Sequence, residues 1–374
     1  MTAGAPPSVP ESDEPTVLPR GTILVGDARQ RLAELPETSV DCVITSPPYF
    51  GLRDYGQPGQ LGAEACIAEW AQQLLVICRE LARVLKPTGA LWLNLGDGYS
   101  RHPREGANTK SLLLGPERVA LALTGDGWLL RNKVVWAKTN PMPASVGDRL
   151  SCGYEVVLLL TRQRRYYFDL DSIRIPAETP LRTARPARTG HYPPDEATPR
   201  LHGGTASRVD LNHGLAAMKA AGQDHHPLGK NPGDVWSLPT ANYRGAHFAT
   251  FPMSLVERPL LSTCPARTCV SCGQPWQRAR QWRQGQLLAV GSLVPDCACQ
   301  RHRSADGRQQ DAPAWRPGVV LDPFIGAGTV ALVAEQHGRD WIGIELNPEA
   351  YSAILIGGVS PQLNRGLTRS TQLS

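Results

Sequence analysis

The sequence predicts an α/β protein in which helices cover both faces of a central sheet. Two short runs rich in β-branched residues, 22–25 and 40–45, each end at polar loop residues, as buried strands of a parallel sheet do. Residues 67–85 follow, and their apolar side chains recur at helical spacing. Because such runs and helical patterns alternate along the chain, we expect a three-layer fold.

The remaining elements follow from the same two periodicities. Lys86-Pro87-Thr88-Gly89 stops the first long helix, and a strand over residues 90–95 comes next. A helix around residues 112–123 is closed by Gly125. The pattern further predicts strands at 129–138 and 155–161, then near the C-terminus a strand at 319–321, a helix through Ala331, Val333 and Ala334, and a strand at 341–345.

Length and composition indicate a protein larger than one minimal domain. The chain has 374 residues, which suits a core of roughly 200–250 residues with insertions. Its net charge of +5 permits a nucleic-acid partner without requiring one. The longest aliphatic run, residues 156–160, is far shorter than the ~20 apolar residues of a membrane helix. With no secretory pattern at the N-terminus, we expect a cytoplasmic protein that has no membrane partner.

The segment from residue 319 to residue 346 has the layout of a nucleoside-binding βαβ unit. An apolar strand leads into Asp322-Pro323-Phe324-Ile325-Gly326-Ala327-Gly328-Thr329, and a helix follows. Gly326 and Gly328 allow a tight turn and a close approach of backbone to ligand. The next strand ends at Glu345, whose carboxylate can accept hydrogen bonds from both ribose hydroxyls. The whole pattern predicts a cofactor site.

A second loop, Ser46-Pro47-Pro48-Tyr49, stands at the end of the strand over residues 40–45. Its two prolines stiffen the backbone and remove two N–H donors, so carbonyl oxygens are left to accept hydrogen bonds from an amino group. Tyr49 offers a flat face on which a base can stack. Taken alone, such a string is more often a rigid loop than a catalytic site.

Together the two loops resemble the DNA amino-methyltransferases that act on N4 of cytosine or N6 of adenine. The resemblance extends over five further segments and about two-thirds of the chain. In this chain the Ser46 loop comes first and the Gly326 loop last, which resembles the beta class, a circular rearrangement of the methyltransferase sheet. The further segments are Arg83-Val84-Leu85-Lys86-Pro87, Trp136-Ala137-Lys138, Tyr166-Tyr167-Phe168-Asp169, Ala246-His247-Phe248-Ala249-Thr250-Phe251-Pro252 and the final unit.

The resemblance implies a Rossmann-like, circularly permuted sheet that binds S-adenosylmethionine, and a role for each matching position. Glu345 is expected to hold the ribose and Asp27 to lie near the adenine ring, although Asp27 serves equally as a strand-end or helix-cap residue. The catalytic set is Ser46, Pro47, Pro48 and Tyr49. The remaining positions are expected at the methionine end of the cofactor: Asp322, Phe324, Gly326, Gly328 and Thr329.

The implied reaction is methylation of an exocyclic amine in double-stranded DNA. Ser46 and the Pro47 carbonyl would accept hydrogen bonds from the amine, so that its lone pair becomes available without a covalent intermediate. The base must leave the helix to reach this site. Ser46 favours cytosine N4 over adenine N6. A non-catalytic DNA-binding protein built on the same scaffold is the alternative of another class.

Five cysteines lie between residues 264 and 299. Cys269 and Cys272 form a knuckle with a two-residue gap, and Cys297 and Cys299 follow. Four thiolates on two turns predict a structural zinc site in a ribbon-like insertion, with Cys264 as a spare ligand. Free thiols in a flexible insertion are the alternative.

These features divide the chain into seven parts. Arginines between 182 and 208 make the insertion at 176–245 the best candidate for reading DNA, although a disordered basic loop fits it as well. We expect a prokaryotic or phage-encoded enzyme, for which a restriction endonuclease is a possible partner; the sequence does not indicate an oligomeric state. The parts are a disordered tail (1–20), a catalytic half (21–175), the target-recognition insertion (176–245), a return to the core (246–261), the irregular cysteine-containing insertion (262–316), a cofactor-binding half (317–360) and a second tail (361–374).

Overall fold

Eight strands of the chain form one mixed sheet in a computed structural model, which describes residues 21–54, 56, 59–176, 226, 228–241, 251–283, 286–299 and 314–347. The chain divides into two compact units. Residues 168–234 and 265–316 form one of them and the rest of the chain forms the other. Several predictions concern residues outside the described ranges: both tails, the arginines between 182 and 208, and the segment from Ala246 to Thr250.

The sheet of the larger unit has the order β1-β12-β11-β2-β3-β5-β4-β6. From β1 to β3 neighbouring strands are parallel, whereas β5 is antiparallel to both of its neighbours and β6 runs parallel to β4. The predicted α/β class is therefore confirmed, with a mixed sheet. The strands are β1 (Thr22–Val25), β2 (Val40–Thr45), β3 (Leu85–Leu95), β4 (Leu129–Lys138), β5 (Tyr154–Thr161), β6 (Val235–Leu238), β11 (Val319–Asp322) and β12 (Asp340–Glu345).

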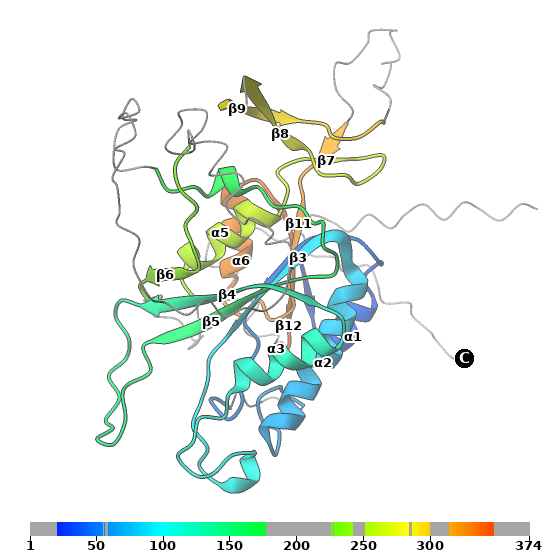
Figure 1. Ribbon diagram of the computed structural model, residues 1–374. Helices are drawn as coiled ribbons and strands as arrows, with labels where there is room; N and C mark the ends of the chain where they lie inside the picture. The colour runs from blue at the N-terminus through cyan, green and yellow to red at the C-terminus, as the bar shows by residue number, and fades with distance from the viewer. Residues whose placement is uncertain are drawn as a thin grey trace, which may run out of the picture. The chain divides into compact units, whose positions relative to one another are not determined.

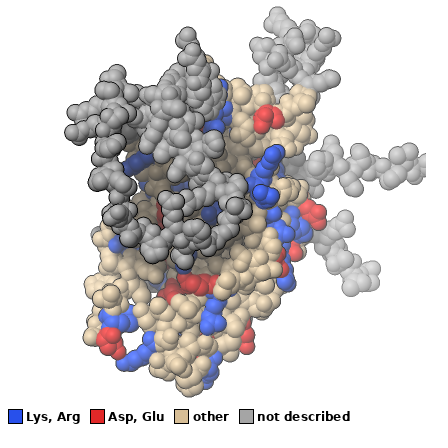
Figure 2. Space-filling model, viewed as in Figure 1, with Lys and Arg blue, Asp and Glu red and all other residues tan. Residues whose placement is uncertain are grey.

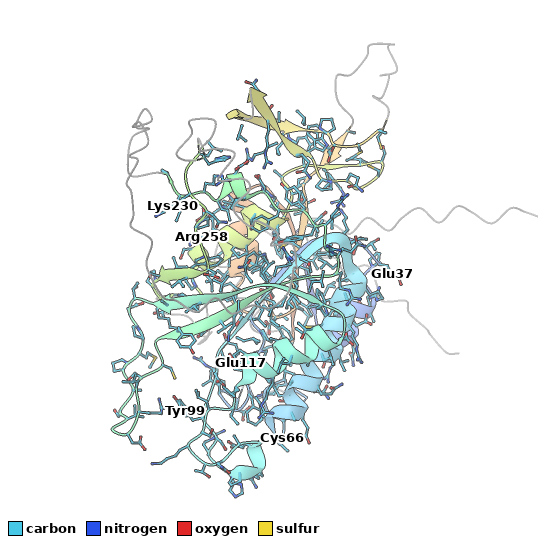
Figure 3. All side chains as sticks on the ribbon, viewed as in Figure 1. Glu37, Cys66, Tyr99, Glu117, Lys230 and Arg258 are labelled. Carbon is cyan, nitrogen blue, oxygen red and sulfur yellow. The ribbon has the colours of Figure 1, made fainter. Side chains whose placement is uncertain are left out.

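Helices cover both faces of this sheet (Figure 1). One layer contains α1, α2 and α3, and the other contains α5 and α6. Side chains of α2 and α3, the helix that carries the labelled Glu117, fill the space beside the sheet (Figure 3). On α5 the Arg258 guanidinium lies 5.3 Å from the ring centroid of Trp236. The helices are α1 (Ala28–Ala33), α2 (Ile67–Val84), α3 (Gly115–Gly125), α5 (Met253–Thr263), α6 (Thr329–Gln336) and the short 3₁₀ helix η1 (Pro103–Glu105).

The starts of two elements differ from the sequence prediction by three residues or more. The strand expected at residue 90 already begins at Leu85, which pairs with Val40 of β2, and Lys86 forms a buried ion pair of 2.6 Å with Asp41 on that strand. The helix expected near residue 112 begins at Gly115. Leu112 bridges to Tyr99, and the Leu113 N–H donates to the Gly98 carbonyl, so these two residues are extended.

The smaller unit contains two strand pairs, β7 (Thr268–Cys269) with β10 (Trp315–Arg316) and β8 (Gln277–Arg283) with β9 (Gln286–Val294). The expectation that residues 262–316 are irregular is therefore wrong for this hairpin, whose mixed polar and apolar residues give no clean alternation. Next to the 3₁₀ helix η2 (Leu170–Ser172), the fully buried Asp171 carboxylate pairs with Arg174 and Arg280. Buried charges of this kind require such partners.

Two surface properties bear on the expected partners. Within the described part of the chain, every helix is too short or too polar to cross a bilayer. On the face shown in Figure 2, basic and acidic side chains are interspersed among uncharged ones over the described surface. The mild positive charge of the chain is therefore not gathered into one patch on that visible face.

Candidate active site

The Ser46 loop and the Gly326 loop meet because they follow neighbouring strands. β2 and β11 are parallel and hydrogen-bonded, with Leu321 paired to Val43. At their carboxyl ends the Thr45 hydroxyl donates to Oδ1 of Asp322 over 2.6 Å. Ligands of open α/β sheets bind at this edge, outside the carboxyl ends of the strands.

A cavity of about 850 Å³ opens between the two loops, within the larger unit. Its volume lies in the ~300–1,000 Å³ range of small-molecule sites. Eight of the predicted site residues line it: Asp27, Ser46, Pro47, Pro48, Tyr49, Phe324, Gly326 and Glu345. Three predicted residues, Asp322, Gly328 and Thr329, are not among its lining residues.

Glu345 and Gly326 are held together at one end of the cavity. The Gly326 N–H donates to Oε2 of Glu345 over 3.0 Å, and the Asn347 N–H donates to Oε1 over 2.9 Å. Gly326 has a φ of 49°, a conformation that a β-branched residue rarely adopts. The Gly326 loop thus places its backbone beside the carboxylate of Glu345, the last residue of β12.

Asp322 lies below this loop rather than in the cavity. It is 1% exposed, and its Oδ1 accepts from Thr45 and from the Phe324 N–H. Burial raises the pKa of the Asp322 carboxyl to about 7, although the two hydrogen bonds oppose that shift. Gly328, with a φ of 78°, is the N-cap residue of α6, and Thr329 is its first residue.

Asp27 caps α1, which confirms the structural alternative weighed for it. Its carboxylate accepts from the Arg29 N–H over 2.8 Å and pairs with the Arg29 guanidinium at 2.5 Å. The hydrogen bond from the Arg29 side chain is the main cause that lowers the pKa of Asp27. Because Asp27 also lines the cavity, capping does not remove it from the site.

The loop after β2 is anchored by a residue that the sequence did not single out. The Trp70 indole N–H donates to the Pro48 carbonyl over 3.0 Å, so that carbonyl has a competing donor, contrary to our expectation for the loop. The Pro47 carbonyl accepts no hydrogen bond from the described residues. Pro47 therefore offers the available acceptor.

Tyr49 is tied into a polar cluster that sequence reasoning missed. Its hydroxyl donates to Oε2 of Glu155 over 2.7 Å, and it lies 3.1 Å from the Ser46 hydroxyl. Asn94 donates from Nδ2 to the Tyr49 hydroxyl and to the Glu155 carboxylate, each over 2.8 Å. Lys138 donates to Oε1 of Glu155 over 2.5 Å. These side chains all line the cavity.

Strand order explains why this cluster forms. Asn94, Glu155 and Lys138 lie on β3, β5 and β4, which are neighbours in the sheet, and Ser46 follows β2 on the other side of β3. The available sequence signal was a polar residue within or next to an apolar run, such as Asn94 between Leu93 and Leu95. On the other side, the Tyr49 ring is so close to Gly96 that a Cβ there would lie 2.6 Å from Cε2.

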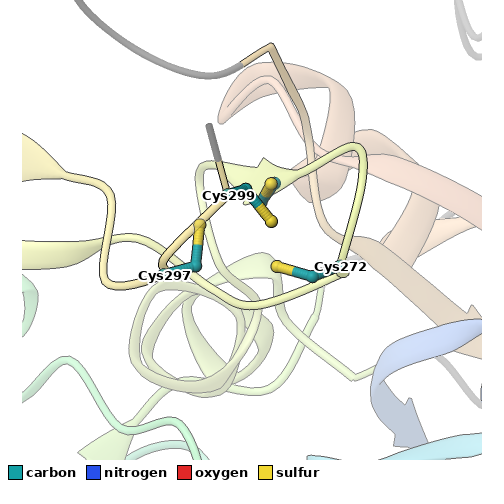
Figure 4. Close-up of side chains that lie close together, drawn as sticks. Cys272, Cys297 and Cys299 are labelled. Carbon is teal, nitrogen blue, oxygen red and sulfur yellow. The ribbon is translucent and has the colours of Figure 1, made fainter. Parts of the chain in front are cut away.

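The smaller unit brings four predicted metal ligands together, of which Figure 4 labels Cys272, Cys297 and Cys299. The sulfur atoms of Cys269, Cys272, Cys297 and Cys299 all lie within 4.8 Å of one another. Burial alone would raise the pKa of the Cys269 thiol. Hydrogen bonds from the backbone N–H groups of Cys272 and Ser271 outweigh burial, so the pKa is lowered to about 7. The spare candidate Cys264 is not part of this group and lies fully buried at the end of α5.

Comparisons with known proteins agree with this geometry. A family model described as DNA methylase, of the N6/N4 methyltransferases, matches residues 40–270 and 315–355. The chain is 32% identical to the Type II methyltransferase M.SmaI of Serratia marcescens, over 87% of each protein. It is also 32% identical to M.XycI of Xanthomonas campestris pv. cyanopsidis, over 92% of this chain and 91% of that one.

The same fold occurs in a solved structure. The PvuII DNA methyltransferase, described as cytosine-N4-specific, superposes with a TM-score of 0.52 at 16% identity, covering 92% of this chain and 88% of that one. At this level of identity the likeness concerns the fold alone. On the family match and the two relatives, the chain belongs to the N6/N4 DNA methylase family, the DNA amino-methyltransferases.

Proposed function

We propose that this chain transfers a methyl group from S-adenosylmethionine to N4 of cytosine in double-stranded DNA. One observation carries the proposal: the Ser46 loop and the Gly326 loop line one cavity, although 277 positions separate Thr45 from Asp322. A nucleoside cofactor and a flipped base need adjoining sites of this kind.

The residues at the Gly326 end suit S-adenosylmethionine. The Glu345 carboxylate borders the cavity with its position set by two backbone N–H groups, and it can still accept hydrogen bonds from ribose hydroxyls. Phe324 and Ile344 add apolar surface for the rest of the nucleoside. We assign Asp27, Phe324, Gly326 and Glu345 to direct contact. Asp322, Gly328 and Thr329 would shape the loop from below.

The Ser46 end suits a base amine. S-adenosylmethionine, when bound, supplies an electrophilic methyl group on a sulfonium. The Ser46 hydroxyl and the Pro47 carbonyl would accept hydrogen bonds from the two amine N–H groups, so that the nitrogen becomes more tetrahedral and its lone pair turns toward the methyl group. The N–C bond would form as the S–C bond breaks with its electron pair left on sulfur, and the methylated nitrogen would release one proton to solvent. Tyr49, held by Glu155 and packed beside Gly96, offers its ring to the flipped base.

The choice of base rests on Ser46. In the family, serine at the first position of this loop accompanies cytosine N4 more often than adenine N6. Adenine N6 is the alternative, because a serine hydroxyl accepts from either amine. A non-catalytic DNA-binding role is the candidate of another class, and the cavity with its loops argues against it.

We also propose the circular permutation and the seven-part division predicted from the sequence. The Ser46 loop precedes the Gly326 loop in the chain although their strands are neighbours, which supports the permutation. The smaller unit gathers residues 168–234 and 265–316, which include most of both insertions. This grouping supports a recognition module made from residues 168–234 and 265–316, whereas residues 235–245 belong with β6 to the larger unit.

Structural zinc is part of the proposal. Four sulfurs at ~2.3 Å from a tetrahedral zinc ion stand about 3.8 Å apart, so a group within 4.8 Å needs little movement to bind it. Cys269, Cys272, Cys297 and Cys299 would hold the ion and join the β7 turn to the segment after β9.

Nucleoside analysis tests the proposed activity. Duplex DNA treated with the protein and S-adenosylmethionine is digested to nucleosides and examined by mass spectrometry. We expect N4-methylcytosine; N6-methyladenine would move the assignment to the alternative, and no methylated base together with no cofactor binding in calorimetry would favour the non-catalytic role. Protection of the methylated DNA from a co-encoded endonuclease would identify the restriction partner.

A further inference from the structure

We propose that Glu155 is a positioning residue that makes Ser46 a hydrogen-bond acceptor toward the base. This inference rests on the proposed function and deepens it. It follows from an inventory of protons along the Ser46–Tyr49–Glu155 series, whose oxygens are 3.1 Å and 2.7 Å apart in turn.

The direction of the series is set at its Glu155 end. An ionised carboxylate accepts hydrogen bonds and donates none. The Lys138 ammonium pairs with Oε1 of this carboxylate, and both side chains are largely buried, at 21% and 15% exposure. Asn94 donates from Nδ2 to Oε2 as well. Glu155 therefore takes the single hydroxyl proton of Tyr49.

This direction passes on to Ser46. A phenol has one proton, so once it points to Glu155 the Tyr49 oxygen is an acceptor toward its other neighbours. Asn94 donates to it over 2.8 Å, and in the Ser46–Tyr49 contact Ser46 must then be the donor. The Ser46 proton then points away from the base position. One Ser46 lone pair faces Asn94 Nδ2 at 3.4 Å, and the other is left to accept an amine N–H.

Removal of the Glu155 carboxylate lets the Tyr49 and Ser46 hydroxyl protons change direction. The Tyr49 proton can then turn to Ser46, and the Ser46 proton can turn into the cavity, where it faces the N–H donors of the amine. A donor facing a donor loses the hydrogen bond and costs the desolvation of both groups. Glu155 thus acts on the base only through Tyr49 and Ser46.

The test compares two substitutions of Glu155 in the full-length protein. Glu155→Met leaves no acceptor for Tyr49, whereas the amide oxygen of Glu155→Gln can still take the tyrosine proton. We expect the single-turnover methylation rate to fall roughly 10- to 100-fold in Glu155→Met and clearly less in Glu155→Gln. Calorimetric affinities for S-adenosylmethionine and for duplex DNA should stay close to those of the wild type.

A second pair of variants shows whether the effect passes through Ser46. In Ser46→Ala the hydroxyl that accepts from the amine is absent, so adding Glu155→Met should lower the methylation rate little further. An equal further loss in the double variant, or equal rates for Glu155→Gln and Glu155→Met, would overturn the proposal. Weakened cofactor binding that accounts for the lost rate would do the same, because Glu155 would then serve the cofactor.

Two controls separate this role from general damage. Glu117→Met breaks an ion pair with Lys133 on the surface, away from the cavity, and should leave the rate unchanged. If Glu155→Met fails to fold because Lys138 is left unpaired, Lys138→Met/Glu155→Met removes both charges and must show the same loss. If the wild-type protein methylates no DNA, the proposed function itself fails; if it does and the variants match it, only the role of Glu155 fails.

Discussion

Thr45 and Asp322 are 2.6 Å apart at the carboxyl ends of two neighbouring strands, with the Thr45 hydroxyl donating to the Asp322 carboxylate. Both side chains are buried, at 2% and 1% exposure. Ser46 follows Thr45 directly, and the Phe324 N–H donates to the same carboxylate oxygen. This contact therefore sets the distance between the two loops of the proposed active site.

Thr45→Val should weaken the contact between the Ser46 loop and the Gly326 loop. Valine has nearly the same shape but cannot donate, so the buried Asp322 loses a partner. We expect the free energy of unfolding to fall by about 1–3 kcal/mol and the affinity for S-adenosylmethionine to fall as well, measured by urea unfolding and calorimetry. Thr161→Val is the matched control. Thr161 is also buried, but it donates locally to Gln163, so only stability should change. Unchanged cofactor affinity in Thr45→Val would contradict the coupling.

Asp322 should give stability a pH dependence of unusual sign for an aspartate. Burial raises the pKa of its carboxyl to about 7 in the fold, against about 3.9 in an unfolded chain. Between these values the folded state holds the extra proton. The stabilisation that the Asp322 carboxyl gives the folded state is therefore complete below about pH 4 and is lost as the pH rises through about 7. The free energy of unfolding changes by at most about 1.4 kcal/mol per pH unit over this range.

Asp322→Asn isolates this contribution. The asparagine variant lacks the titrating group, so wild-type stability relative to the variant should decrease from about pH 5 to about pH 7. Urea unfolding of both proteins across that range gives the difference, in which the other carboxylates cancel. A constant difference would show that Asp322 titrates normally.

Ser46→Ala and Gly326→Val should separate catalysis from cofactor binding. Ser46→Ala removes an acceptor for the amine, so methylation slows by on the order of 100-fold, while S-adenosylmethionine still binds. Gly326→Val forces a β-branched residue to a φ of 49° beside Glu345, so cofactor binding is lost. Gly338→Val controls for backbone strain, since Gly338 has a φ of 62° outside the cavity. Calorimetry and single-turnover rates check the three proteins, and the same loss of cofactor affinity in Ser46→Ala and Gly326→Val would contradict the assigned roles.

The cysteine group should retain one zinc ion per chain after extensive dialysis, as measured by plasma mass spectrometry. Cys297→Ser removes one of four ligands and should release the metal. Cys152→Ser is the control, because Cys152 is exposed and lies outside the group. Cofactor binding should survive metal loss, since the cavity is lined from the larger unit alone. A metal-free protein as isolated, with full stability, would leave four free thiols as the better description.

The local pattern of the sequence predicted most of the larger unit. Runs rich in β-branched residues such as Val40–Thr45 indicate buried strands of a parallel sheet, and the helix over Ile67–Val84 follows from its apolar spacing. The two loops were identifiable because proline and glycine restrict or free the backbone whatever the surroundings are. Eight of the eleven predicted catalytic and cofactor residues consequently line the cavity.

Only the tertiary structure decided which residues become neighbours. Asn94, Glu155 and Lys138 meet because β3, β5 and β4 are adjacent, and nothing in the spacing of these residues states that order. The hairpin of β8 and β9 likewise depends on pairing rather than on alternation. Periodicity records how each segment relates to solvent and core, whereas pairing between segments depends on contacts far apart in the chain. The sequence by itself therefore determined the elements and the two loops, and the fold decided the polar cluster that holds Ser46 and Tyr49.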